Sequence, residues 1–341
     1  MHLGGLQQQA SDLGPTCCSL AWQKIPLTCF PPGAAQHPFC CLIRQLCPMD
    51  FGMSQTETWT VRRILQWTTD WLSKQGVGSP RLDGELLLAH TLTLRRLDLF
   101  LDPDRPLSPD ELQRYKAFIK RRAAREPVAY IVGKKPFLHW ELTVTAGVLI
   151  PRPETEHLVQ AAQDFFNQQQ RAPHTILDIG TGSGAILLAL LDHFNEAQGI
   201  GIDISKAALA CAQHNGEQLN LNNRAQWLYS HFCDDLPHES RFDLILSNPP
   251  YINSDVIPTL EAEVNQWEPR LALDGGVDGM QAYQQIIPAA VARLNPGGLL
   301  GVEIGHDQGP RVAALMQQHG LQQVVVHKDY AQHDRVVLGH R

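Results

Sequence analysis

A short apolar run, residues 242–247, leads directly into a polar turn made of Asn248, Pro249, Pro250 and Tyr251. The apolar run predicts a strand that is buried on both faces. Each proline holds its φ near about −65° and donates no backbone hydrogen bond, so the turn is rigid. Because ligands bind at the carboxyl ends of strands in open α/β sheets, we expect this turn to face a ligand.

The groups in this turn suit the alkylation of a planar nitrogen atom. An amide or exocyclic amino nitrogen is a poor nucleophile because its lone pair is delocalised. The side-chain carbonyl of Asn248 and the backbone carbonyl of Pro249 can each accept an N–H bond from such a nitrogen, which orients it and stabilises the positive charge that it gains. Tyr251 can pack on the flat substrate group. A turn of this kind alone is also a common proline-rich loop, so a second motif is needed.

That second motif is a glycine-rich turn between a strand, residues 175–179, and a helix that begins near residue 184. Glycine lets the backbone take positive φ and approach a ligand closely. The spacing of the three glycines is not G-x-G-x-x-G, which disfavours a dinucleotide. The next strand ends about 20 residues later in Asp203, where an acid can accept bonds from ribose hydroxyls. The turn itself consists of Gly180, Thr181, Gly182, Ser183 and Gly184.

Together, these motifs resemble the S-adenosylmethionine-dependent methyltransferases of the Asn-Pro-Pro-Tyr type. More narrowly, the chain is similar to the peptide chain release factor glutamine N5-methyltransferases from about Thr56 to its C-terminus. The narrower similarity rests on further stretches: Ile150-Pro151-Arg152-Pro153-Glu154-Thr155-Glu156, Glu268-Pro269-Arg270 with Gly275-Gly276 and Asp278-Gly279, and Glu303-Ile304-Gly305.

The resemblance implies a cofactor, a substrate and the residues that bind them. The cofactor is S-adenosyl-L-methionine, and the substrate is the glutamine in the Gly-Gly-Gln loop of peptide chain release factors. Cofactor contacts are implied for the glycine turn with Thr181 and Ser183, and for Asp203, Phe232 and Asn248. Catalytic roles are implied for Asn248, Pro249 and Tyr251, and substrate contacts for these three with Pro250, Arg152 and Glu154. Asp178 is expected to support the glycine turn or the methionine end of the cofactor.

One position departs from the family pattern. In the stretch Ser230-His231-Phe232-Cys233, His231 stands where the family usually has an acid. Phe232 is still available to stack on adenine.

Composition narrows the possible classes of protein. The chain has 341 residues, of which 43% are hydrophobic, and a formal net charge of −7. This length favours two domains. The excess of acidic over basic residues disfavours non-specific binding to nucleic-acid phosphates. The sequence contains no run of 18 apolar residues, so it predicts no membrane span. No metal-ligand spacing is present, so we assign no metal. Two cysteines, Cys211 and Cys233, suit the core of a cytoplasmic protein.

We predict a Rossmann-like class I methyltransferase fold of the α/β class, preceded by a small helical bundle. Residues 1–52 hold six of the eight cysteines and only four charged residues, and we expect a disordered or non-native leader, with Met53, or alternatively Met49, as the functional start. Residues 53–126 predict the helical domain, which the resemblance assigns to docking of the protein substrate. Residues 127–150 predict a β-hairpin linker, and 151–341 the methyltransferase domain. We interpret Lys120-Arg121-Arg122 as a solvated helix end.

Three alternatives remain open at this point. The first is a glutamine methyltransferase that acts on a ribosomal protein, which Pro153-Glu154-Thr155-Glu156 disfavours. The second is a nucleic-acid amino methyltransferase, which the acidic balance disfavours. The third, from a different class, is a non-catalytic assembly factor that uses the fold for binding, and the intact Asn248 and glycine turn argue against it.

Overall fold

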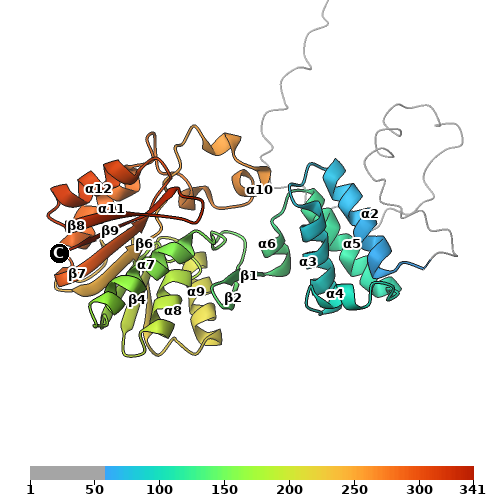
Figure 1. Ribbon diagram of the computed structural model, residues 1–341, viewed down its shortest axis with the longest axis horizontal. Coiled ribbons are helices and arrows are strands. Elements are labelled where there is room, and N and C mark those ends of the chain that lie inside the picture. The colour runs from blue at the N-terminus through green and yellow to red at the C-terminus, as the bar shows by residue number, and fades with distance from the viewer. Residues whose placement is uncertain (1–57) are drawn as a thin grey trace, which may run out of the picture. The chain divides into compact units, whose positions relative to one another are not determined.

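The computed structural model describes residues 58–341, so the expectations for residues 1–52 and Met53 lie outside the described residues. Helices come first, a two-stranded hairpin follows, and strands then alternate with helices (Figure 1). The first helices are α2 (Val61–Lys74), α3 (Pro80–Leu92), α4 (Asp98–Leu101), α5 (Pro109–Ala123) and α6 (Val128–Val132).

The start of α5 is fixed by its local sequence. The Ser108 side chain accepts the backbone N–H of Glu111, while the Glu111 side chain accepts the N–H of Ser108, which completes a capping box. One turn further on, Tyr115 is fully buried and its hydroxyl bonds to Thr68 of α2 and to the Gly84 carbonyl of α3. These contacts hold the three longer helices together.

The end of α5 is not a solvated cationic cluster at Arg122, and that part of our interpretation is wrong. The Arg122 guanidinium is buried and donates to Asp83 at 2.7 Å and to Glu263 at 2.6 Å. Arg125 donates to the other oxygen of Glu263 at 2.5 Å. Because buried charges are stable only when they are paired, these carboxylates explain how Arg122 can be buried.

The segment 127–150 contains the predicted strand pair together with an unpredicted short helix. β1 (Lys134–Phe137) and β2 (Trp140–Thr143) pair antiparallel. Helix α6 precedes them, entered through Pro127 and terminated by Gly133, whose φ is +76°. Glycine adopts this left-handed conformation without strain, so the helix ends there.

A seven-stranded sheet forms the centre of the remaining chain, in the order β5-β4-β3-β6-β7-β9-β8. β3, β4, β5, β6 and β7 are parallel, and β9 runs antiparallel to both β7 and β8, so β8 and β9 form an antiparallel hairpin at the edge of the sheet. The strands are β3 (Thr175–Ile179), β4 (Gln198–Asp203), β5 (Ala225–Tyr229), β6 (Phe242–Ser247), β7 (Leu294–Glu303), β8 (Gln322–Lys328) and β9 (Asp334–His340).

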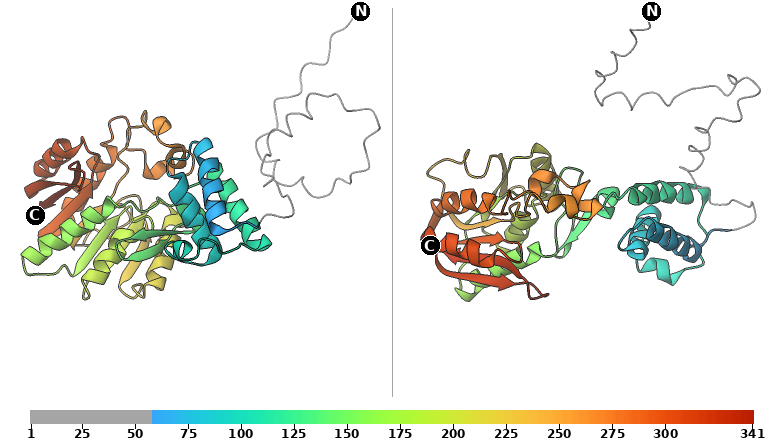
Figure 2. Two further views of the ribbon diagram at one scale, coloured as in Figure 1. Left: turned by 45° about the vertical axis from the view of Figure 1, so that its right-hand side comes forward. Right: turned by 90° about the horizontal axis from the view of Figure 1, so that it is seen from above.

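Helices cover both faces of this sheet, as Figure 2 shows from two further directions. They are α7 (Thr155–Gln168), α8 (Ala185–His193), α9 (Lys206–Gln218), α11 (Gln281–Val291) and α12 (Gly309–Gln318), with the short α10 (Ala262–Asn265) and the 3₁₀ turns η1 (Ile257–Thr259) and η2 (Arg270–Ala272) before α11.

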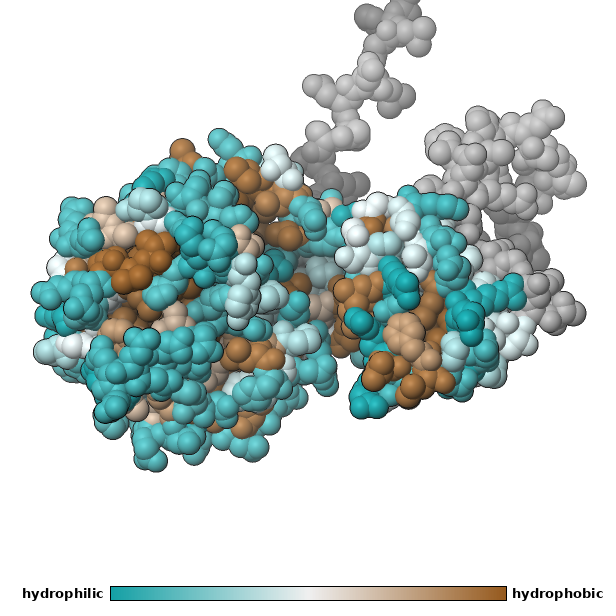
Figure 3. Space-filling model, in the orientation of Figure 1, coloured by the Kyte–Doolittle hydropathy of each residue, from teal (hydrophilic) through white to brown (hydrophobic). Residues whose placement is uncertain are grey.

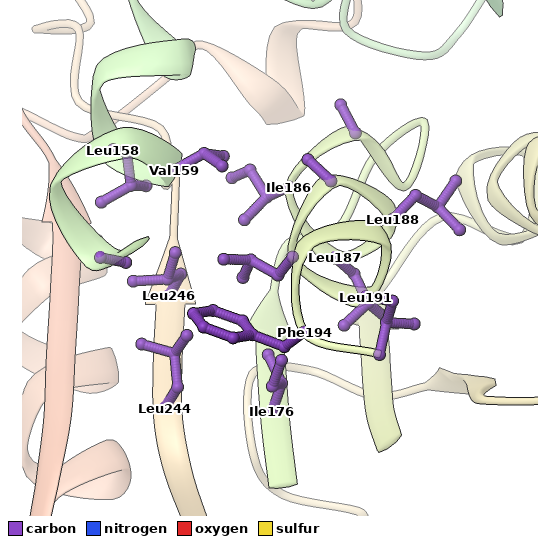
Figure 4. Packing of buried hydrophobic residues seen from close by; sticks show 14 of the residues in the cluster. Leu158, Val159, Ile176, Ile186, Leu187, Leu188, Leu191, Phe194, Leu244 and Leu246 are labelled. Atoms are coloured by element: carbon purple, nitrogen blue, oxygen red, sulfur yellow. The ribbon is translucent and has the colours of Figure 1, made fainter. Parts of the chain in front are cut away.

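Two hydrophobic cores lie on opposite faces because successive side chains of a strand alternate in direction. Leu244 and Leu246 of β6 belong to the core under α7 and α8, whereas Ile245 belongs to the core under α11 and α12. Figure 4 shows Leu244 and Leu246 beside Phe194 and the leucines of α8. The continuous apolar run of β6 therefore reflects burial on both faces, as predicted.

Residues 58–341 include no helix that is long and apolar enough to cross a bilayer. Within the same range, no group of three or more His, Cys, Asp and Glu side chains is arranged to hold a metal ion. Cys211 and Cys233 are buried and unpaired, as expected of core thiols.

Candidate active site

Three strand ends meet at one edge of the sheet. β3 lies between β4 and β6, with Ile179 opposite Ile202 on one side and Ser247 on the other. The glycine turn after β3, Asp203 at the end of β4 and Asn248 after β6 therefore lie at the same edge. A pocket of about 280 Å³ opens there and is lined by all three segments. Further lining residues come from the segments before α7 and before α11: Gly147, Val148, Leu149, Pro151, Arg152, Pro269, Leu271 and Ala272.

The glycine turn takes a backbone shape that only glycine adopts without strain. Gly180, Gly182 and Gly184 have φ values of +74°, +57° and +81°. A Cβ added to Gly180 or Gly182 would meet no atom within 4 Å, so the space above the turn is open. The turn is anchored from below, because the Thr181 hydroxyl donates to Asp178 at 2.7 Å. Burial raises the pKa of Asp178 to about 7, although the bond from Thr181 opposes the rise.

Of the two roles expected for Asp178, the structure provides a contact for one. Asp178 is buried beneath the turn and holds Thr181, which supports a structural role in the turn. Asp178 does not line the pocket, in contrast to Thr181 and Ser183.

Asp203 lines the pocket and also ties the turn to β4. One carboxylate oxygen accepts the N–H of Gly182 at 2.9 Å, and the other accepts the N–H of Ser205 at 2.8 Å. Burial raises the pKa of Asp203, and these backbone bonds oppose the rise. Since each carboxylate oxygen can accept a second bond, Asp203 retains the capacity to bind a pair of hydroxyl groups.

Replacing Asp203 with alanine is expected to weaken the binding of S-adenosylhomocysteine by about 1–3 kcal/mol, because a hydrogen bond to a charged acceptor is lost. Asp203→Asn, which keeps the size and one acceptor oxygen, should lose less. Titration calorimetry measures both affinities. An alanine variant that binds as tightly as the wild type would remove Asp203 from the cofactor site.

The segment after β5 contributes Phe232, which lines the pocket and is partly buried. Its φ of +47° is unusual for a non-glycine residue. His231, which replaces the acid typical of the family, also lines the pocket, but its side chain is exposed and lies 3.2 Å from Asp234. Phe232 is therefore available as a flat apolar wall.

Two residues of the Asn-Pro-Pro-Tyr turn line the pocket, and the other two do not. Asn248 and Pro250 line the pocket, whereas Pro249 is buried and, like Tyr251, does not belong to the lining. The Asn248 amide nitrogen donates to Thr155 at 3.0 Å. The Tyr251 hydroxyl donates to Glu303 at 3.2 Å, so its polar end is directed to the interior.

Of the two remaining predicted site residues, only one lines the pocket. Arg152 lines the pocket and forms an ion pair with Glu268 at 2.5 Å, while Glu154 is exposed and does not line the pocket. Glu268 has a buried side chain and accepts the N–H of Ile150 as well. Glu268 thus holds the segment before α7 against the pocket.

Sequence reasoning assigned no role to four residues that hold the site together: Thr155, Asn215, Glu268 and Glu303. Thr155 and Glu303 are buried and bonded to each other at 2.6 Å. Asn215 of α9 joins the hairpin to the glycine turn, because its side chain bonds to Thr143 and to the Ser183 carbonyl. Three of them lie in stretches already quoted for the family resemblance, but Asn215 had no signal at all.

Two family models match the chain. The PrmC N-terminal domain matches residues 63–133, and a methyltransferase domain matches residues 176–267. The first of these spans the helical segment and the second begins at β3.

Curated relatives match nearly their whole length. A release factor glutamine methyltransferase of Caulobacter vibrioides is 44% identical over 82% of this chain and 96% of its own. Proteins of the same name from Geobacter sulfurreducens and Moorella thermoacetica are 41% and 40% identical, each over 83% of this chain and over 97% and 99% of their own lengths. The chain therefore belongs to the release factor glutamine methyltransferase family, whose members are S-adenosylmethionine-dependent enzymes.

Proposed function

We propose that this protein transfers a methyl group from S-adenosylmethionine to the side-chain amide nitrogen of the glutamine in the Gly-Gly-Gln loop of peptide chain release factors. One observation carries the proposal. At the edge of the pocket, the nitrogen of the Asn248 amide is engaged by Thr155, which leaves the carbonyl oxygen as the acceptor for a substrate N–H. We place this activity in the cytoplasm, where release factors act in translation termination.

The residues of the glycine turn fit the cofactor. Open space lies above Gly180 and Gly182, the Asp203 carboxylate borders that space and Phe232 offers a flat wall. These residues would hold the ribose and adenine parts of S-adenosylmethionine. When bound, the cofactor supplies a methyl group on a positively charged sulfur, which leaves as a neutral thioether.

The protein's contribution is to orient the acceptor nitrogen and to stabilise its charge. The Asn248 side-chain carbonyl, at the pocket, would accept one N–H bond of the primary amide, and the backbone carbonyl of Pro249, whose residue lies outside the pocket lining, would accept the other. Their partial negative charges stabilise the positive charge that develops on the nitrogen. A sulfonium leaving group needs no proton, so no general acid is required for its departure, and the methylated nitrogen becomes neutral by releasing one of its two protons to water.

A protein substrate also suits the surface of the helical segment. Apolar side chains are exposed along α3 and α4 (Figure 3), and Leu97 and Leu101 are 63% and 75% exposed. Exposed apolar patches of this kind are typical of surfaces that contact another protein. The net charge of −7 makes a nucleic-acid substrate less favourable, because phosphate binding requires a basic face.

The deciding experiment uses methyl-labelled cofactor with three acceptors: a release factor, the same factor with its loop glutamine changed to glutamate, and a mixture of DNA and RNA. Label is expected only on the unmodified release factor. Label on nucleic acid, or equal label on the glutamate variant, would contradict the proposed substrate.

A further inference from the structure

A chain of two hydrogen bonds runs from a buried carboxylate to the Asn248 amide. Glu303 at the end of β7 lies 2.6 Å from the Thr155 hydroxyl, and Thr155 lies 3.0 Å from the Asn248 amide nitrogen. Thr155 is the first residue of α7, so three separate elements contribute one residue each. Glu303 is only 1% exposed, which leaves it few partners other than those in the protein.

The direction of these bonds follows from the number of protons available. An ionised carboxylate can only accept, so the single hydroxyl proton of Thr155 must be donated to Glu303. The Thr155 oxygen is then left as an acceptor and requires a donor from Asn248. Only the nitrogen end of the Asn248 amide can donate, so the carbonyl oxygen is turned away from Thr155.

We propose that Thr155 and Glu303 are positioning residues that fix the Asn248 amide with its carbonyl oxygen toward the substrate nitrogen. This inference rests on the proposed function, because it assigns the orientation on which acceptance of the glutamine N–H depends. Without the bond to Thr155, the Asn248 amide can rotate by about 180° and turn its own N–H groups toward the N–H groups of the substrate. Such a rotation is easy because the two ends of an asparagine side chain are nearly identical in shape.

The same carboxylate holds the other end of the Asn-Pro-Pro-Tyr turn. The second Glu303 oxygen accepts the Tyr251 hydroxyl at 3.2 Å, and the Glu303 backbone carbonyl accepts the Tyr283 hydroxyl at 2.8 Å. Asn248, the first residue of the turn, is therefore linked to the Glu303 side chain through Thr155. Tyr251, the last residue, is bonded to the same side chain directly. Such a doubly tied turn keeps the rotamer of Asn248 fixed before the substrate arrives, which is the purpose of preorganisation.

The protonation state of Glu303 matters for this arrangement. Burial raises the pKa of Glu303 to about 7, whereas bonds from Thr155 and Tyr251 and the charge of Arg335 lower it, and the nearby Glu154 raises it. Once protonated, Glu303 donates one bond and can no longer accept from both Thr155 and Tyr251. The rate of methyl transfer should therefore fall as the pH falls through about 7.

A pair of substitutions at Thr155 separates the hydroxyl from the shape of the side chain. Thr155→Val keeps the volume and removes the hydroxyl, and Thr155→Ser keeps the hydroxyl. The matched control is Thr91→Val, because Thr91 is a buried helical threonine whose hydroxyl donates to the Leu87 carbonyl of its own helix, α3. Single-turnover rates on a release factor, calorimetry with S-adenosylhomocysteine and melting temperatures are measured for all variants.

We expect Thr155→Val to lower the single-turnover rate about tenfold or more, as for the loss of one oriented hydrogen bond, with cofactor affinity within about twofold of wild type. Thr155→Ser and Thr91→Val should stay within about threefold of the wild-type rate. A valine variant with the wild-type rate, or a serine variant as slow as the valine variant, would overturn the assignment. If the wild-type enzyme itself labels no release factor, it is the proposed function that fails.

A second measurement does not depend on the stability of the valine variant. The pH dependence of the single-turnover rate is compared for wild type and Glu303→Gln between pH 6 and pH 8. The wild-type rate should rise with pH, whereas the glutamine variant should be slower at pH 8 and independent of pH. A glutamine variant that is as fast as wild type at pH 8 would show that the carboxylate does not position Asn248.

Discussion

Replacing Asn248 with alanine is expected to reduce the rate of methyl transfer by about 10²–10³-fold, the range found when one preorganised group that stabilises transition-state charge is removed. The physical reason is that the acceptor nitrogen then loses both its orientation and the carbonyl that faces its developing positive charge. Cofactor binding should remain largely in place, because the glycine turn and Asp203, which also line the pocket, are unchanged.

Single-turnover kinetics on the release factor, together with calorimetry using S-adenosylhomocysteine, distinguish these two effects. Asn167→Ala is a suitable control, since Asn167 is exposed near the end of the same helix that carries Thr155. If the Asn248 variant turns over at nearly the wild-type rate, the role that we assign to its side chain is wrong.

Replacing Arg122 with methionine is expected to destabilise the protein by about 3–5 kcal/mol, because the change leaves the buried Asp83 carboxylate without its cation and Glu263 with Arg125 alone. The side chains of Asp83 and Glu263 are 11% and 13% exposed, and burial together with the nearby charge of Glu263 already raises the pKa of Asp83. Methionine keeps the length of the side chain and removes the charge.

Urea unfolding followed by tryptophan fluorescence measures this loss, since Trp67 and Trp71 lie in α2 of the same helical segment. The control is Arg62→Met, which removes an exposed pair with Asp104 and should cost less than about 1 kcal/mol. Equal losses in the two variants would mean that burial of the Arg122 pairs contributes nothing beyond an ordinary surface contact.

The sequence was sufficient to predict the strands β3 and β6 and the edge of the sheet at which the pocket opens. The continuous apolar runs of β3 and β6 specify buried parallel strands, and the glycines and prolines that follow them mark the turns. These are local properties, so a single stretch of sequence contains them. The relatives confirm the family that these turns indicate.

The contacts that hold the site were not predictable in the same way, because their partners are distant in the sequence. Thr155 and Glu303 are separated by 148 residues, and Arg122 and Glu263 by 141. Locally, Thr155 is one residue of a helix start and Arg122 one of three cations at a helix end. The carboxylates that give these two residues their roles lie beside them only in the tertiary structure.

The roles of Tyr251 and Glu154 remain predictions. Packing of the Tyr251 ring on the substrate was inferred from its position after two prolines, whereas its hydroxyl is bonded to Glu303. Glu154 was expected to contact the substrate, but its side chain is exposed outside the pocket lining. Local sequence shows that a residue is near a turn, but it does not show in which direction its side chain points.

The pairing of β3 with β6 also has a consequence for the order in which the chain folds. β3 pairs with β4 after a short connection, but its other neighbour is synthesised much later, as shown by the Thr175–Asp243 contact across 68 residues. Closing so long a loop costs more entropy than forming the local pairs. A nascent chain that ends before β6 can therefore shape the glycine turn while one edge of β3 stays unpaired. Until the chain has been synthesised past residue 248, that unpaired edge can pair with other strands. A chaperone that covers the edge during this time would prevent such misassembly.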